Sequence, residues 1–207
     1  MFTGIVTAIG TIREASLKGD LRAVIACPFD PDKIAIGASI ACSGVCLTVV
    51  ERGGKAGNAW FAVDASAETL ARTVPGMWEA GRRLNLEPAL KMGDELGGHI
   101  VTGHVDAVGS VVGREPEGAS TRLTISAPQA VAPYIAPKGS VTVDGVSLTV
   151  NAVEDQADGS VHFGLNIIPH TGEVTTLGAL GAGDRVNLEI DVLARYIQRM
   201  QSLRTQP

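Results

Sequence analysis

The stretch Gly44-Val45-Cys46-Leu47-Thr48-Val49 returns as Gly145-Val146-Ser147-Leu148-Thr149-Val150, a displacement of 145 − 44 = 101 positions. Other segments repeat at nearly the same displacement: Asn85-Leu86-Glu87 returns as Asn187-Leu188-Glu189, and Thr3-Gly4-Ile5-Val6 returns as Thr102-Gly103-His104-Val105. A repeat near half of the 207 residues is too long for a solenoid and is typical of a duplicated small domain. The sequence therefore predicts two tandem copies of one fold.

Each copy contains about six short segments rich in β-branched and small residues, separated by glycine and proline turns. No long helical pattern lies between them, which favours an all-β class with small antiparallel barrels over a parallel α/β sheet. We expect residues 38–50 to form one strand, and Gly44 inside it to mark a bulge or a close approach of two backbones. The predicted barrels span residues 1–95 and 96–192.

The last segment, residues 193–207, has a different pattern. Leu193, Ile197, Met200 and Leu203 recur at helical spacing, which predicts one amphipathic helix without a counterpart in the first copy. Its apolar stripe is expected to pack between subunits. The alternative is that the helix caps its own barrel.

Composition excludes several functions. The net charge of −5 without a basic run disfavours nucleic-acid binding, and no apolar run is long enough to cross a membrane. Three cysteines and no secretory signal favour a reducing, cytoplasmic setting. Cys42 and Cys46 would share one face of a strand, and with His99 and His104 they could suggest zinc. Their spacing lacks a second tight pair, so we expect no metal. Glycine signatures of dinucleotide and phosphate loops are missing, which disfavours a dehydrogenase or a kinase.

Candidate chemistry gathers in two places. His99 and His104 stand five apart in a glycine-rich setting, where one of them could line a cleft and transfer protons; the alternative is that both are polar turn residues. Small hydroxyl and thiol groups accompany the repeated strands, at Ser39, Cys46, Thr48, Ser147 and Thr149, although such groups often only satisfy local hydrogen bonds. A duplicated pocket also suits two copies of one ligand, which would meet at a pseudo-twofold axis.

The residues that carry these repeats closely resemble one family. The start Met1-Phe2-Thr3-Gly4-Ile5-Val6, the two Gly-Val-x-Leu-Thr-Val strands, Gly97 to Val105 and Asn187 to Asp191 are similar to riboflavin synthase of the alpha-chain type. The resemblance runs from residue 1 to about 196. It implies two six-stranded Greek-key barrels, a carboxy-terminal helix and assembly as a homotrimer. A contact with lumazine synthase is a further partner to consider.

The resemblance also implies a reaction. Two molecules of 6,7-dimethyl-8-ribityllumazine dismutate by exchange of a four-carbon unit, giving riboflavin and 5-amino-6-(ribitylamino)uracil, with no metal or redox cofactor. The site would hold two lumazines between the amino-terminal barrel of one subunit and the carboxy-terminal barrel of the next.

The family's pocket residues map onto matching positions of this sequence. One lumazine would be held by Gly4-Ile5-Val6, Cys46-Leu47-Thr48, Asp64-Ala65-Ser66-Ala67-Glu68-Thr69 and Gly103-His104-Val105. The other would be held by Lys138, Ser147-Leu148-Thr149 and Ile168-Pro169-His170-Thr171-Gly172-Glu173. The sequence departs from the family mainly at Ala65 to Ala67 and at Gly172, where leucine is commoner.

Catalytic roles follow from residue type. One proton must leave the acidic 7-methyl group of a lumazine, and His104 is the best candidate base. Ser39, Cys46 and Asp191 would position or polarise the second molecule or a water, and Phe2 belongs to the same set. The competing interpretation is an antenna-type protein that binds lumazine or flavin without catalysis. The presence of Phe2, Ser39, Cys46 and His104 favours the enzyme over that protein and over an inert scaffold.

Overall fold

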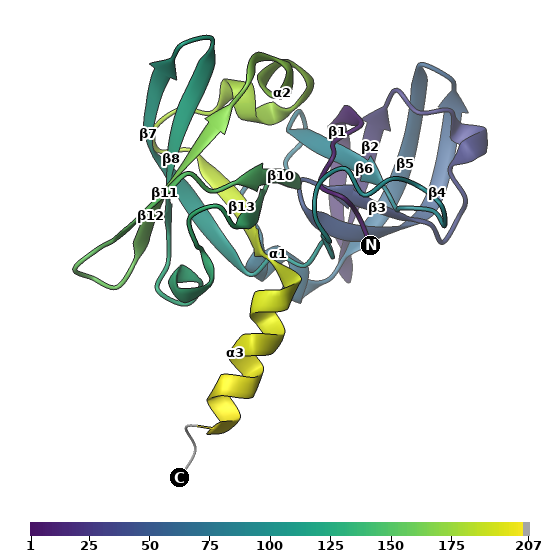
Figure 1. The fold of residues 1–207 in the computed structure, drawn as a ribbon. Coiled ribbons are helices and arrows are strands. Elements are labelled where there is room, and N and C mark those ends of the chain that lie inside the picture. Colours follow the sequence, from purple (N-terminus) through teal and green to yellow (C-terminus); the bar gives the residue numbers. More distant parts are fainter. Residues whose placement is uncertain (205–207) are drawn as a thin grey trace.

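The computed structural model describes residues 1–204. Two β-rich halves lie side by side, and one long helix projects away from them (Figure 1). This arrangement confirms the predicted all-β class with a duplicated barrel and a carboxy-terminal helix. No helix in the described part of the chain is both long and apolar enough to span a membrane.

The first half is a closed six-stranded antiparallel barrel with the strand order β1-β2-β5-β4-β3-β6. Its strands are β1 (Ala8–Lys18), β2 (Asp20–Cys27), β3 (Ser39–Cys42), β4 (Val45–Lys55), β5 (Asn58–Ala65) and β6 (Arg83–Pro88). A 3-10 turn, η1 (Pro31–Lys33), and a short helix, α1 (Ala67–Arg72), connect them. The hydroxyl of Ser66 accepts a hydrogen bond from the Thr69 amide and caps α1, as that residue type favours.

The second half repeats this order with one strand divided. Its strands are β7 (Ala107–Glu117), β8 (Ser120–Ala127), β9 (Ser140–Val143), β10 (Val146–Thr149), β11 (Ala152–Asp155), β12 (Val161–Ile167) and β13 (Arg185–Ile190). The helical pieces are η2 (Ala132–Tyr134), α2 (Pro169–Val174) and η3 (Thr176–Ala179). The sheet order β10-β9-β13-β7-β8-β12-β11 places β10 and β11, which are consecutive in the chain, at its two edges.

The division of the fourth strand has a counterpart in the first barrel. The amide of Val150 donates to Gly139, whereas the amide of Asn151 donates to Gly164 of β12, so the chain changes partner at this point. At the equivalent place in the first half, β4 carries a bulge between Val49 and Glu51. The bulge bends β4 without breaking it, while the second copy separates into β10 and β11.

The prediction of one strand over residues 38–50 was wrong. Ser43 and Gly44 form a tight turn between β3 and β4, with φ angles of 45° and 81°, and Asp144 and Gly145 repeat it with 46° and 80°. Two consecutive positive φ values are the requirement of a type I′ hairpin, for which Asp-Gly between apolar segments is a strong signal. Cys42 and Cys46 consequently lie on neighbouring strands and not on one face of a single strand, with Cys42 buried in the core.

Gly44 does mark a close approach of two backbones. A Cβ atom added to Gly44 would lie 2.9 Å from the amide nitrogen of Gly145, so the two hairpin turns meet where the halves join. Asn85 donates through Nδ2 to the carbonyl of Asp144, and Asn187 donates through Nδ2 to the carbonyl of Ser43, each at 2.9 Å. These reciprocal bonds relate the two halves by an approximate twofold axis.

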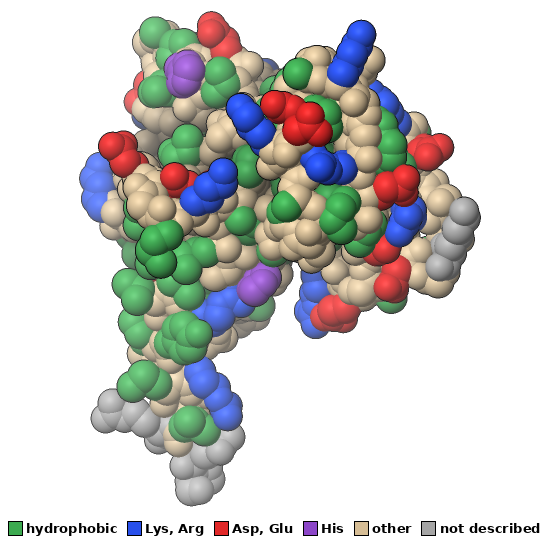
Figure 2. Space-filling view, turned by 90° about the vertical axis from the view of Figure 1, so that its right-hand side faces the viewer, with side chains coloured by type: hydrophobic (Ala, Val, Ile, Leu, Met, Phe, Trp, Pro, Cys, Tyr) green, Lys and Arg blue, Asp and Glu red, His purple; other side chains and the backbone are tan. Residues whose placement is uncertain are grey.

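The helix α3 (Val192–Arg204) leaves this body after β13. Leu193, Ile197, Met200 and Leu203 are each more than half exposed, and hydrophobic side chains gather along the helix in Figure 2. The alternative that this stripe caps its own barrel is therefore wrong: the stripe faces away from the chain that carries it.

Candidate functional site

Two segments cross from one half to the other to build the site. The amide of Cys46 on β4 donates to the carbonyl of Gly103, and the amide of Ser147 on β10 donates to the carbonyl of Gly4, both at 2.8 Å. Residues 103–105 therefore lie on the first barrel, and residues 4–6 lie on the second. Val105 packs against the core of the first barrel and Val6 against that of the second. The grouping of Gly4 to Val6 with Cys46 was wrong, because Gly4 contacts Ser147 and Val6 packs on the second barrel.

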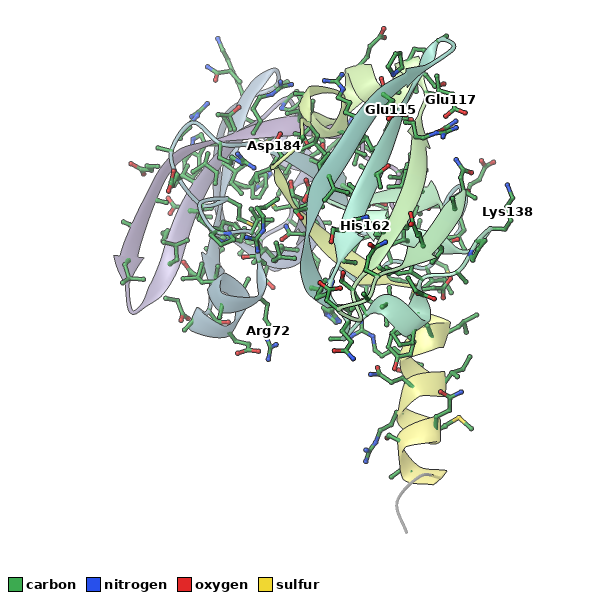
Figure 3. All side chains as sticks on the ribbon, turned by 90° about the vertical axis from the view of Figure 1, so that its left-hand side faces the viewer. Arg72, Glu115, Glu117, Lys138, His162 and Asp184 are labelled. Atoms are coloured by element: carbon green, nitrogen blue, oxygen red, sulfur yellow. The ribbon has the colours of Figure 1, made fainter. Side chains whose placement is uncertain are left out.

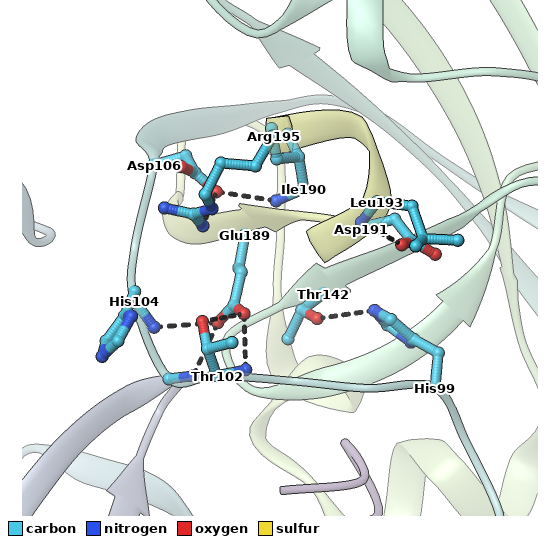
Figure 4. A network of polar contacts seen from close by, with 11 residues as sticks. His99, Thr102, His104, Asp106, Thr142, Glu189, Ile190, Asp191, Leu193 and Arg195 are labelled. Carbon is cyan, nitrogen blue, oxygen red and sulfur yellow. Dashed lines mark hydrogen bonds and ion pairs between the residues drawn. The ribbon is translucent and has the colours of Figure 1, made fainter. Parts of the chain in front are cut away.

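A buried glutamate fixes each crossing segment. Glu189 on β13 accepts four hydrogen bonds of 2.6–2.9 Å, from the amide and hydroxyl of Thr102 and from the amides of Gly103 and His104 (Figure 4). Glu87 on β6 accepts three, from the amide and hydroxyl of Thr3 and from the amide of Gly4. Burial raises the pKa of Glu87, and the donors oppose this effect. Charge-assisted bonds of this kind hold the backbone of each segment rigidly.

The segment held by Glu189 closes a pocket of about 390 Å³ on the first barrel. Its walls come from β4, α1 with the residue that follows it, and the crossing segment. The lining residues are Val45, Cys46, Glu68, Thr69, Arg72, Thr73, Gly103, His104, Val105 and Asp106. We call it the amino-terminal pocket. Cys46, Glu68, Thr69 and the Gly103 to Val105 segment were predicted to line one pocket, and the structure brings them together.

Charged groups gather around this pocket. The carboxylate of Glu68 accepts a hydrogen bond of 2.7 Å from Nε of Arg72, one turn later on α1 (labelled in Figure 3). Asp106 accepts from the amide of Ile190 and from the Arg195 guanidinium, while burial raises the pKa of this carboxyl. The side chain of His104 is exposed beside them, with its backbone fixed by Glu189. Arg72 and Asp106 were missed, although the four-residue spacing of Glu68 and Arg72 is the one that pairs side chains on a helix.

The approximate twofold axis defines an equivalent set of residues on the second barrel. For each residue that lines the amino-terminal pocket, the other copy of the repeat contains an equivalent residue. These equivalents are Val146, Ser147, His170, Thr171, Val174, Thr175 and Gly4 to Thr7. We call this set the carboxy-terminal pocket. His104 corresponds to Ile5, Arg72 to Val174 and Asp106 to Thr7, so the two pockets share a backbone plan and differ in chemistry. The amino-terminal pocket carries Glu68, His104 and Asp106, whereas the carboxy-terminal set keeps one ionisable group among these positions, His170 in the place of Glu68.

His99 makes a second difference between the pockets. Its Nδ1 lies 2.7 Å from the hydroxyl of Ser147, and its Nε2 lies 3.2 Å from the hydroxyl of Thr142, which pairs with Ser147 across β9 and β10. Burial lowers the pKa of His99, opposed by Asp191 and Glu189. A neutral ring can donate to one hydroxyl and accept from the other. His99 therefore fixes Ser147, whereas among the described residues no side-chain hydrogen bond fixes its counterpart Cys46.

Several predicted residues lie elsewhere. Phe2 is fully buried between Ala41 and Val101 and forms an antiparallel bridge to Val101, so it supports the wall behind Cys46. Asp191 accepts from the Leu193 amide at the start of α3. Ser39 pairs with Thr48 on the β3-β4 hairpin. Among the described residues, these three are outside the lining of the amino-terminal pocket.

The remaining predicted residues also need correction or placement. Asp64 points outward and forms a two-bond ion pair with Arg22, and Leu47 and Ala65 belong to the barrel core. Lys138 lies in a different groove, on the outer face of β8, β11 and β12, near Glu117 and His162 (Figure 3). Ile168, Pro169 and His170 are exposed at the start of α2. Within residues 1–204 no group of three His, Cys, Asp or Glu side chains is arranged to hold a metal ion.

Comparisons with known proteins agree with this geometry. The lumazine binding domain family matches residues 3–89 and 102–191. The chain is 50% identical to riboflavin synthase of Brucella abortus (strain 2308) over 97% of this chain and 98% of that protein, and 46% identical to riboflavin synthase of Mycobacterium bovis (strain ATCC BAA-935 / AF2122/97) over 97% and 98%. The crystal structure of LumP complexed with riboflavin superposes with a TM-score of 0.78 at 26% identity, covering 92% of this chain and 99% of that one. This chain belongs to the riboflavin synthase family of proteins built from two lumazine binding domains.

Proposed function

We propose that the chain converts two molecules of 6,7-dimethyl-8-ribityllumazine into one riboflavin and one 5-amino-6-(ribitylamino)uracil. A four-carbon unit moves from one lumazine to the other, so every atom of the two substrates is found in the two products. The observation that carries the proposal is the pair of crossing segments, which place equivalent backbone segments against β4 of the first barrel and β10 of the second.

The two pockets would hold the two lumazines in unequal roles. His104, Glu68 and Asp106 surround the amino-terminal pocket, so proton removal from the 7-methyl group takes place there. At the carboxy-terminal pocket, Ile5, Thr7 and Val174 replace His104, Asp106 and Arg72, and His170 replaces Glu68. Ser147 of this pocket is held by His99. This pocket binds and orients the second ring. Catalysis then comes from holding two rings at reacting distance and from one general base.

The exposed stripe on α3 supports an assembly in which pockets of neighbouring subunits face each other. Within the homotrimer that we propose, Leu193, Ile197 and Met200 pack against other subunits. Deletion of residues 193–207 should give monomers with little turnover, measured by sedimentation and by product formation. A deletion variant that keeps the trimer mass would show that another surface holds the subunits together.

The test of the reaction uses the purified protein, the lumazine and a chelator, with product formation and ligand binding measured on the same sample. We expect riboflavin to appear. The second candidate is antenna-type binding, since LumP has been crystallised with 6,7-dimethyl-8-(1'-D-ribityl) lumazine and superposes with a TM-score of 0.74 at 24% identity. Stoichiometric binding of the lumazine with no riboflavin would favour that candidate. The higher identity to riboflavin synthases favours the enzyme.

A further inference from the structure

A second cavity lies between the two barrels, apart from both pockets. It has a volume of about 310 Å³ and is lined from both halves. Its polar walls include Ser43, Arg82, Arg83, Asp144, Asp184 and Arg185. Figure 3 labels Asp184 at the junction of the halves. This cavity shares no lining residue with the amino-terminal pocket or with the carboxy-terminal pocket.

Positive charge from both halves meets at this cavity. Arg83 is the first residue of β6 and Arg185 the first residue of β13, so the approximate twofold axis relates them. Arg82 adds a third guanidinium. In the described part of the chain, none of these three side chains forms an ion pair or donates a hydrogen bond. Three exposed arginines with free donors that line one cavity are suited to an anion with several oxygen atoms.

A buried carboxyl group faces the same cavity. Asp144 is 8% exposed, and its Oδ1 accepts a hydrogen bond of 2.8 Å from the amide of Asn187. Its Oδ2 has no partner within residues 1–204. Burial raises the pKa of Asp144 to about 7, and Arg82 opposes this effect. Below that pH the group is a neutral carboxyl, which can donate its O–H to a bound oxygen.

We propose that the cavity between the barrels binds a phosphate group, either as free inorganic phosphate or as the monoester of a small sugar. Arg83 and Arg185 contact its oxygens from opposite halves, Arg82 supplies further charge, and the protonated Asp144 donates a hydrogen bond. The volume accommodates a phosphate with a small attached group. Because the ligand contacts both halves, its binding stabilises their mutual arrangement. The proposal does not depend on the lumazine reaction.

Calorimetric titration of the full chain tests the proposal with three ligands at constant ionic strength: sulfate, inorganic phosphate and ribose 5-phosphate. We expect one saturable site per chain. The double variant Arg83→Gln and Arg185→Gln should bind at least tenfold more weakly. Lys33→Gln removes one exposed positive charge from η1, outside the lining of the cavity, and this variant should bind as the unmodified protein does. Tighter binding of ribose 5-phosphate than of phosphate would identify the esterified form, and the reverse order the free form.

The role of Asp144 has its own test with sulfate, whose charge stays constant between about pH 6 and pH 8. The charged groups that face Asp144 at this cavity are Arg82, Arg83, Asp184 and Arg185. Sulfate affinity should fall about tenfold as the pH rises through 7, and Asp144→Asn should remove this dependence. Asparagine keeps the acceptor for Asn187 and tolerates the positive φ of the turn. The proposal is wrong if no saturable binding occurs, if the double arginine variant binds normally, or if Asp144→Asn keeps the pH dependence.

Discussion

The carbonyl oxygen of Gly103 accepts a hydrogen bond of 2.8 Å from the amide of Cys46, although the two residues belong to different copies of the repeat. Through this bond, the segment that carries His104 becomes a wall of the first barrel. Its twofold counterpart, from Ser147 to Gly4, places Ile5 where His104 stands in the other pocket. One duplicated backbone thus gives two pockets with different chemistry.

His104→Ala should keep lumazine binding and lose turnover. Removal of a general base typically lowers the rate on the order of a hundredfold or more, while the backbone bonds from Glu189 do not need the imidazole. Turnover at saturation and a binding titration separate the two effects. His162→Ala, on the outer face of β12, is the matched control. Weaker binding with unchanged saturated turnover would make His104 a contact residue and leave Cys46, which lines the same pocket, as the next candidate.

Glu189→Gln and Glu87→Gln form a matched pair. Each glutamine loses the charge and presents an NH₂ group to backbone amides, so each variant should lose about 2–4 kcal/mol of unfolding free energy. Their effects on activity should differ. Glu189→Gln releases the segment of His104 and should lower turnover, whereas Glu87→Gln should mainly weaken the binding of one lumazine. Denaturant unfolding and steady-state kinetics measure both, and equal kinetic effects would contradict the unequal roles.

Gly44→Ala tests the contact between the two hairpin turns. Both Gly44 and Gly57 have φ near 80°, but an added Cβ meets the Gly145 amide at Gly44 and nothing within 4 Å at Gly57. Gly57→Ala should therefore lower the free energy of unfolding by about 1 kcal/mol, because only the left-handed backbone is strained. Gly44→Ala should lower the free energy of unfolding by about 3 kcal/mol, because overpacking adds to that strain. Denaturant unfolding measures both free energies. Similar losses of unfolding free energy for the two variants would show that the two hairpin turns move apart at little energetic cost.

Asp144→Asn should change how stability depends on pH. The folded pKa of about 7 is above the ordinary value of 3.8, so the folded state holds this proton more tightly than the unfolded chain. Asp144 therefore lowers the free energy of unfolding as the pH rises from about 4 to 7, with little further change above 7. The variant should match the unmodified protein near pH 4 and exceed it at pH 8 by up to about 4 kcal/mol. Parallel curves for the two proteins would contradict a buried carboxyl that ionises near neutrality.

The repeat and the strand patterns predict much of this fold, because alternation and turn residues act locally. The hairpin at Ser43 and Gly44 was missed because Ser-Gly is a weaker turn signal than Asp-Gly, and the second copy contains the stronger form at Asp144 and Gly145. The crossing of residues 4–6 to Ser147 has no local signal. The repeat shows that residues 4–6 and 103–105 are equivalent, but the barrel that each contacts depends on packing between the halves.

The central claim is that two lumazine molecules react with each other on this chain. The most direct measurement incubates the purified protein with 6,7-dimethyl-8-ribityllumazine as the sole substrate and quantifies all three compounds by chromatography over time. We predict that one riboflavin and one 5-amino-6-(ribitylamino)uracil form for every two lumazines consumed. Riboflavin formed without an equal amount of 5-amino-6-(ribitylamino)uracil, or lumazine that stays bound and unchanged, would contradict the claim.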